Sequence, residues 1–167
     1  HEVLESCAAH LVNHGGHAMA AGIRLRADQV EAFTAAFQAE AARRLTPQDL
    51  RPKLQLDDVV PLPQLTTEMV DALDRLAPFG EGNPRPRLAT PTVELVEPPR
   101  TVGRNGAHLQ FTVRQQGTYR KAIAFGCGPQ ADALGQHREV QVAFEPLINE
   151  WNGRRKVDLR VIDWRPA

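Results

Sequence analysis

Cysteine, long apolar runs and net charge are all scarce in this chain of 167 residues. The two cysteines, Cys7 and Cys127, are far apart and form no Cys-x-x-Cys pair, so neither a zinc site nor a disulfide framework is expected. This cysteine usage favours a reducing cytoplasm. No apolar run reaches the roughly 18 residues of a membrane-spanning helix, so we expect no membrane association.

The chain also lacks an initiating methionine and the charged and apolar regions of a signal peptide. We therefore expect His1 to lie inside a longer gene product. The hydrophobic content of 42% is enough for a core and argues against wholesale disorder. A chain of this length accommodates one ordinary domain or two small ones.

The zero net charge conceals an asymmetry between the two halves. Residues 1–87 carry 9 Lys and Arg against 12 Asp and Glu, whereas residues 88–167 carry 11 against 8. A polyanionic ligand is therefore expected to meet the second half.

Helical periodicity dominates the first half. Helices are predicted over residues 2–13, over the stretch after a cap formed by Asp28 and Glu31, and from Thr66 or Thr67 to Pro78. We interpret the apolar stripes of the last two as core faces: Val30, Phe33, Phe37, Ala41 and Leu45 in one, and Leu65, Met69, Leu73, Leu76 and Ala77 in the other. Residues 47–63, with four prolines, read as a connector that contains the strand-like piece "KLQLDDVV".

Period-two alternation replaces the helical pattern from Leu88 onward. Five strands are predicted, at 88–96, 107–114, 119–125, 140–144 and around 157–161, with a short helix near 129–134. Asn105-Gly106 and Asn152-Gly153 are hairpin-turn signals. The fold class is therefore α+β, with a five-stranded OB-type β-barrel at the C-terminal end, although periodicity alone also allows another small barrel or a sandwich.

A pair of glycines followed by histidine, Gly15-Gly16-His17, is the most distinctive stretch of the first half. Adjacent glycines let backbone N–H groups approach an anion, and the imidazole adds a side-chain donor. The same residues are also consistent with a tight turn in which His17 is hydrogen-bonded within the protein and binds no ligand. A metal site at His10, His14 and His17 is not favoured, because no carboxylate is nearby to complete the shell.

The stretch "GGHAMAAGI" resembles the glycine-glycine-histidine motif of the DHH-associated domain, the substrate-binding half of the DHH phosphoesterases. Downstream, "LDDVVPLPQLTTEMVDALDRLAPFGEGNPRP", "AHLQFTV", "AIAFGCG" and "INEWNGRRKVDLRV" resemble the C-terminal OB region of the bacterial RecJ family of single-stranded-DNA exonucleases. The resemblance covers essentially the whole chain. It implies three parts: residues 1–46 from the DHH-associated domain, residues 47–87 as a connector with a helix, and residues 88–167 as the OB domain.

The resemblance also implies the roles of individual residues. Gly15, Gly16 and His17 would hold the substrate phosphate. The Asp-His-His motif of the family's metal centre does not occur in the chain, so no catalytic or metal-binding residue is expected here. Mn²⁺ or Mg²⁺ would be bound by the DHH domain of the same polypeptide, and this chain alone would be inactive.

The OB half is expected to bind single-stranded DNA through cations and aromatic rings. The candidates are Arg104, Arg114, Lys121, Trp151, Arg154, Arg155, Lys156 and Arg160, with Arg100 and Arg120 as further basic residues. A solvated surface charge is the simpler interpretation of each one taken singly, whereas Arg154, Arg155 and Lys156 form a cluster beside Trp151.

We therefore expect the substrate-binding part of a metal-dependent exonuclease that degrades single-stranded DNA from the 5′ end in repair and recombination. Two alternatives stay open: part of another DHH phosphodiesterase that acts on short oligonucleotides, or a non-catalytic OB binding module. The sequence leaves open whether a single-strand-binding protein docks here.

Overall fold

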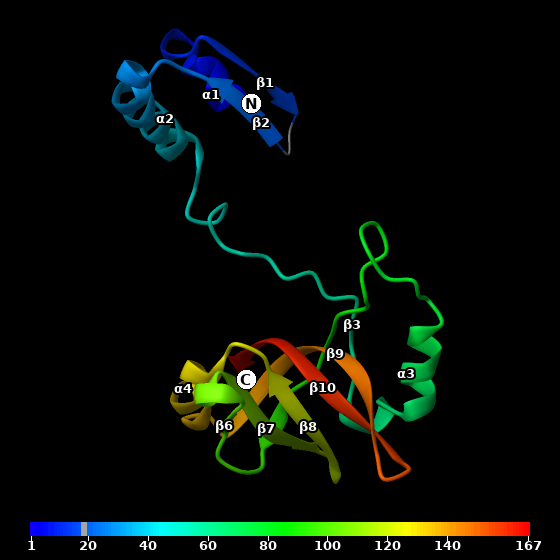
Figure 1. Ribbon diagram of the computed structural model, residues 1–167. Helices are drawn as coiled ribbons and strands as arrows, with labels where there is room; N and C mark the ends of the chain where they lie inside the picture. The colour runs from blue at the N-terminus through cyan, green and yellow to red at the C-terminus, as the bar shows by residue number, and fades with distance from the viewer. Residues whose placement is uncertain (18–19) are drawn as a thin grey trace. The chain divides into compact units, whose positions relative to one another are not determined.

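A computed structural model describes residues 1–17 and 20–167, and these form two compact units, His1–Leu54 and Gln55–Ala167 (Figure 1). Ala18 and Met19 of the glycine-glycine-histidine stretch lie outside the described residues.

The first unit contains two helices and a hairpin. Helix α1 (Glu2–Ser6) and a 3₁₀ turn (Ala8–His10) precede β1 (Asn13–His17) and β2 (Ala20–Arg24), and a second 3₁₀ turn (Ala27–Gln29) leads into α2 (Val30–Arg44). The prediction of one helix over 2–13 is wrong beyond Ser6. The Val12 N–H donates to the Arg24 carbonyl at 2.8 Å, so hairpin pairing takes this segment out of the helix.

Helix α2 differs from the prediction in its cap and in its burial. Asp28 accepts a hydrogen bond from Arg26 at 3.1 Å instead of capping the helix. The rings of Phe33 and Phe37 pack 5.7 Å apart, but no residue of α2 is fully buried. The predicted apolar stripe is therefore only half covered within this unit.

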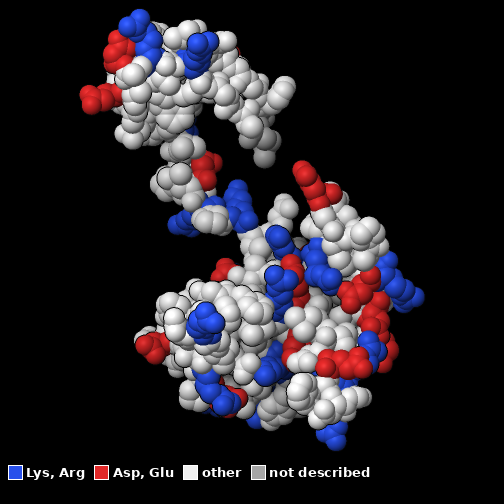
Figure 2. All heavy atoms as spheres, viewed as in Figure 1, with Lys and Arg blue, Asp and Glu red and all other residues white. Residues whose placement is uncertain are grey.

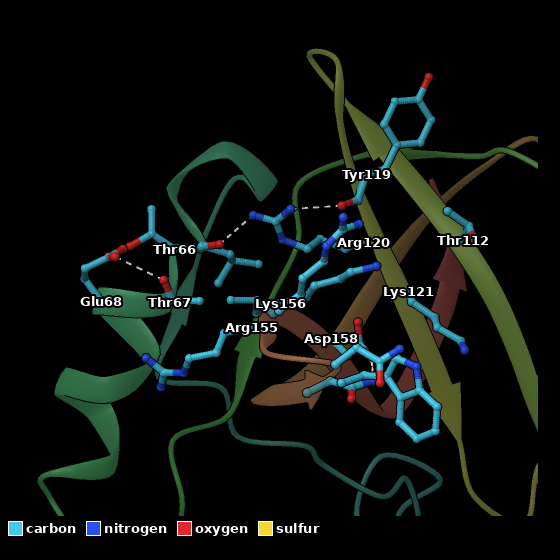
Figure 3. Close-up of a pocket in the computed structure, with 16 residues that line it drawn as sticks. Thr66, Thr67, Glu68, Thr112, Tyr119, Arg120, Lys121, Arg155, Lys156 and Asp158 are labelled. Carbon is cyan, nitrogen blue, oxygen red and sulfur yellow. Dashed lines mark hydrogen bonds between the residues drawn. The ribbon is translucent and has the colours of Figure 1, made fainter.

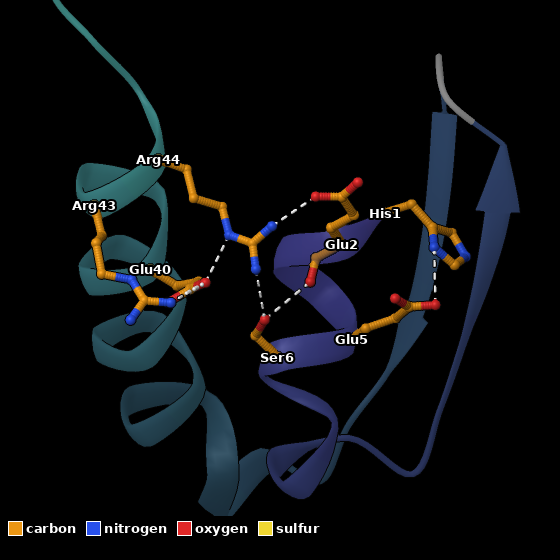
Figure 4. A network of polar contacts seen from close by, with 7 residues as sticks. All are labelled: His1, Glu2, Glu5, Ser6, Glu40, Arg43 and Arg44. Atoms are coloured by element: carbon orange, nitrogen blue, oxygen red, sulfur yellow. Dashed lines mark hydrogen bonds and ion pairs between the residues drawn. The ribbon is translucent and has the colours of Figure 1, made fainter.

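Arg44 joins α2 to α1 through polar contacts (Figure 4). Its guanidinium donates to the Glu2 carboxylate at 2.7 Å, to Glu40 at 2.6 Å and to the Ser6 hydroxyl at 3.1 Å. Because all these groups are partly exposed, the network orients the two helices without burying charge.

The second unit is built on a closed five-stranded barrel. Its strands are β5 (Val93–Leu95), β7 (His108–Gln115), β8 (Thr118–Ala124), β9 (Glu139–Trp151) and β10 (Arg154–Pro166). They pair in the order β5, β7, β8, β10, β9 and back to β5, with only β8 and β10 parallel within this ring. Helix α4 (Ala131–Gly135) connects β8 to β9. This is the OB arrangement, which confirms the predicted fold class.

Three short strands extend the barrel. Strands β3 (Asp58–Val59) and β4 (Leu88–Ala89) pair in parallel, and β4 continues the sheet onto β9. Strand β6 (Arg100–Val102), which pairs with β7, was not among the predicted strands. Gln116-Gly117 and Asn152-Gly153 join the long hairpins with positive φ at both residues, as two-residue hairpin turns require. Asn105-Gly106 also has positive φ, but it lies in a 3₁₀ turn (Arg104–Gly106) within a longer loop between β6 and β7.

The segment before the barrel contributes to the barrel core. A 3₁₀ turn (Leu62–Gln64) and α3 (Thr67–Asp74) bring Leu62, Leu65 and Val70 into the same buried cluster as Phe144 and Leu159. Thr66 caps α3, because its hydroxyl accepts from the Met69 N–H at 3.2 Å. Of the stripe predicted for this helix, Leu76 is instead exposed.

Candidate nucleic-acid interface

An open groove of about 1180 Å³ runs along the second unit (Figure 3). Its walls are β8 with Thr112 of β7, the β9–β10 hairpin, and the segment that begins α3. The lining residues are Leu65, Thr66, Thr67, Glu68, Thr112, Tyr119, Arg120, Lys121, Asn149, Trp151, Asn152, Arg154, Arg155, Lys156, Val157 and Asp158.

Strand alternation places the polar side chains of this groove. Val157 and Leu159 on β10 are buried in the core, so Lys156 and Asp158 lie on the opposite face. On β8, Ala122 is buried and Lys121 is exposed by the same rule. Trp151 ends β9 beside the turn, with 75% of its surface exposed, and offers an apolar face to solvent.

Arg155 is held at the edge of the groove by Asp71 of α3. Its two terminal nitrogens donate to the two carboxylate oxygens of Asp71 at 3.1 and 2.7 Å. The Arg155 guanidinium lowers the pKa of the Asp71 carboxyl below its usual range. An incoming anion would therefore compete with Asp71 for Arg155.

Arg120 anchors the segment before α3 to β8. Its Nη2 donates to the Leu65 carbonyl at 2.6 Å and its Nη1 to the Tyr119 carbonyl at 2.9 Å. Burial lowers the pKa of this guanidinium, and the charge of Asp158 opposes that shift. Arg120 is therefore a structural cation that holds two walls of the groove together.

Asp158 and Asn149 face one another across the β9–β10 hairpin. The Asn149 amide donates to Asp158 Oδ2 at 2.7 Å. Six other lining residues were not predicted as site residues: Asp158, Asn149, Glu68, Thr66, Thr67 and Tyr119. For Asp158 the signal was available, because period-two alternation puts residues 154, 156 and 158 on one face.

Of the predicted nucleic-acid contacts, the groove brings together Lys121, Trp151, Arg154, Arg155 and Lys156. The other three do not line it. Arg114 forms an ion pair with Glu94, Arg160 lies 3.6 Å from a carboxylate oxygen of Glu145, and Arg104 is in the 3₁₀ turn before β7. Figure 2 shows Lys and Arg interspersed with Asp and Glu over the second unit, so the cationic character of the groove is local.

The glycine-glycine-histidine stretch forms the β1–β2 hairpin of the first unit. Gly15 pairs with Gly22, Gly16 with Ala21, and His17 with Ala20. A Cβ on Gly16 would lie 2.4 Å from the Ala20 carbonyl oxygen, so glycine is required there. Gly15 has open space around it and the His17 side chain is exposed, so both are accessible to a ligand.

Metal ligands do not cluster in the part of the chain that the structure describes. Among residues 1–17 and 20–167, no three His, Cys, Asp or Glu side chains come together as a metal site would require. The described residues therefore do not fit a bound Mn²⁺ or Mg²⁺. Among the same residues, no helix is both long and apolar enough to cross a membrane.

Comparison with known proteins identifies both the fold and the family. Residues 56–163 match the model of the RecJ OB domain. The chain is 31% identical over 97% of its length to a single-stranded-DNA-specific exonuclease RecJ of Bacillus subtilis, and 33% identical over 98% to that of Thermus thermophilus. It spans about a fifth of the length of these relatives, 20% and 22% respectively.

A crystal structure of RecJ from Thermus thermophilus in complex with Mg²⁺ is similar over 99% of this chain and 25% of that one, with a TM-score of 0.78 and 31% identity. A second structure of that protein, with Mn²⁺, gives the same TM-score at 32% identity. The closed OB barrel and these matches agree, and the chain belongs to the RecJ family.

Proposed function

We propose that this chain is the substrate-binding C-terminal portion of a metal-dependent exonuclease that degrades single-stranded DNA in the 5′-to-3′ direction, in DNA repair and recombination. The observation that supports this most is the groove on the OB barrel, where cations and an exposed indole lie together. The cations can bind the phosphates of a single strand, and the indole can stack on its unpaired bases. The free cysteines Cys7 and Cys127 suit a reducing cytoplasm.

The groove binds a strand through three exposed cations. Lys121, Arg154 and Lys156 line it, and no residue that the structure describes forms an ion pair with them. Each can neutralise a phosphate and release a counterion. Arg155 adds a fourth cation when a phosphate displaces Asp71.

In the first unit, we propose that Gly15, Gly16 and His17 bind the phosphate under attack. Backbone N–H groups and an imidazole stabilise negative charge that develops on a phosphate oxygen. Metal ions such as the Mg²⁺ and Mn²⁺ in the related RecJ structures would be held by a DHH domain of the same polypeptide. Without that domain, the purified chain should release no nucleotides from single-stranded DNA with Mn²⁺ or Mg²⁺.

The test measures affinity for a fluorescent oligothymidylate against salt concentration. Replacement of Arg154, Arg155 and Lys156 by alanine should flatten the slope of log affinity against log salt by up to about 2, at ~0.7 for each single-strand phosphate contact. The matched control replaces Arg85, Arg138 and Arg165, which do not line the groove. Equal slopes in the two folded variants would make the cluster an ordinary solvated face and would contradict the proposal.

A further inference from the structure

Two carboxylates, Glu68 and Asp158, line the groove, and Asp158 lies on the strand face that also carries Lys156. Asp158 is half-buried and lines the groove together with Lys121 and Lys156 (Figure 3). A carboxylate repels a DNA backbone, so its presence suits a different part of the ligand. The Asn149 amide holds Oδ2 at 2.7 Å, and Oδ1 accepts no hydrogen bond from any residue in the described ranges 1–17 and 20–167.

An oriented carboxylate with unused acceptor capacity can bind the edge of an unpaired base. The Watson–Crick edge of guanine presents two adjacent donors, N1–H and the N2 amino group, which match the two oxygens of a carboxylate. Adenine and cytosine present one amino donor beside a ring-nitrogen acceptor, and thymine presents one N–H between two carbonyls. Each of these places an acceptor against the carboxylate.

Asp158 also interacts electrostatically with the partly buried Arg120, but among the described residues this leaves Oδ1 without a hydrogen-bond donor. Trp151, on the same strand face as Asn149, gives a base a ring to stack on. Lys121 and Lys156 lie on the same groove and can bind the phosphates on either side of that base.

We propose that Asp158, oriented by Asn149, forms a guanine-reading subsite within the groove. This inference rests on the proposed function, because the groove must bind a single strand before one base can be preferred. It predicts a base preference in an interface whose other contacts are independent of sequence.

The test compares oligothymidylates of about 12 nucleotides, within the usual footprint of an OB domain, in which every third base is guanine, hypoxanthine or adenine. Hypoxanthine retains the N1–H of guanine and lacks the N2 amino group. Fluorescence anisotropy with the full chain should show at least about 5-fold tighter binding of the guanine oligomer, the lower end of what a bidentate base contact supplies.

Asp158→Asn should abolish this preference while its affinity for plain oligothymidylate stays the same or rises. Asp132→Asn, the same change at an exposed aspartate of α4 that does not line the groove, is the matched control and should retain the preference. Equal affinity of the unmodified chain for guanine and hypoxanthine oligomers overturns the inference without any variant, and so does a loss of preference in both variants. Failure to bind any oligomer overturns the proposed function, and this inference with it.

Discussion

Arg155 on β10 and Asp71 on α3 form a two-point ion pair, with nitrogen–oxygen distances of 3.1 and 2.7 Å, across 84 positions of sequence. The pair connects the helix before the barrel to the hairpin that carries the basic cluster. Because of this pair, Arg155 can bind a phosphate only when Asp71 is displaced, whereas the other two cations of the cluster are unpaired among the described residues.

Replacement of Asp71 by alanine should therefore strengthen binding to single-stranded DNA. Freed Arg155 can contact a phosphate, which would steepen the slope of log affinity against log salt by about 0.7. The melting temperature should change little, because the pair is half exposed on both sides. Asp74→Ala, on the same helix and paired with Arg85, is the control and should leave the slope unchanged. An unchanged affinity of Asp71→Ala for single-stranded DNA would contradict a contact between Arg155 and phosphate.

The ion pair between Arg155 and Asp71 should persist below the pH at which an ordinary aspartate is protonated. Arg155 lowers the folded-state pKa of Asp71, so the contribution of the pair to stability is present above the ordinary carboxyl pKa. That contribution is lost only as the pH falls through the lowered value. Carboxyl-carbon NMR should show Asp71 titrating below the ordinary aspartate range, and Arg155→Ala should return its pKa toward that range. Identical titrations in the two proteins would mean that the pair does not persist in solution.

Trp151→Ala should weaken single-strand binding by about 1–3 kcal/mol, the cost of one lost stacking contact. The melting temperature should stay unchanged, because 75% of the Trp151 surface is exposed. Phe125→Ala is the matched control, since Phe125 is also an exposed aromatic on the second unit but does not line the groove. Titration of a fluorescent oligomer measures both variants, and equal losses would contradict the assignment of Trp151 to the interface.

The Thr90 side chain, directly after β4, supplies the acceptor for a backbone N–H of β9. Its buried hydroxyl accepts from the Val142 N–H at 3.0 Å. Thr90→Val retains the shape but leaves this N–H unpaired, which should cost about 1–3 kcal/mol of unfolding free energy in urea. Thr90→Ser should restore most of the loss, because it retains the acceptor. Equal stability of the valine and threonine proteins would mean that the N–H finds another partner.

His17→Ala, made in the full-length protein, separates a phosphate ligand from a structural residue. The exposed position of His17 on β1 predicts an unchanged melting temperature. If the imidazole stabilises charge on the reacting phosphate, single-turnover cleavage should slow by on the order of 100-fold while DNA affinity falls only modestly. A destabilised variant with near-normal turnover would make His17 structural.

Local patterns were sufficient to predict the architecture of the barrel. Alternation at 107–114 and around 157–161, and turn signals such as Asn152-Gly153, depend only on neighbours along the chain, so these strands and turns could be predicted. The boundaries were less certain. The predicted helix over 2–13 ended at Ser6 because Val12 found a partner in Arg24, and β6 was too short to show a period.

The site divides in the same way. The sequence by itself determined that Arg154, Lys156 and Asp158 share one strand face beside Trp151, because side-chain direction in a strand follows from parity. Only the tertiary structure decided that Lys121 joins them, that Arg114 is paired with Glu94, and that Arg155 is paired with Asp71. Those outcomes depend on which distant segments pack together, and pairing between charges is decided by distance in space, which spacing along a chain does not encode.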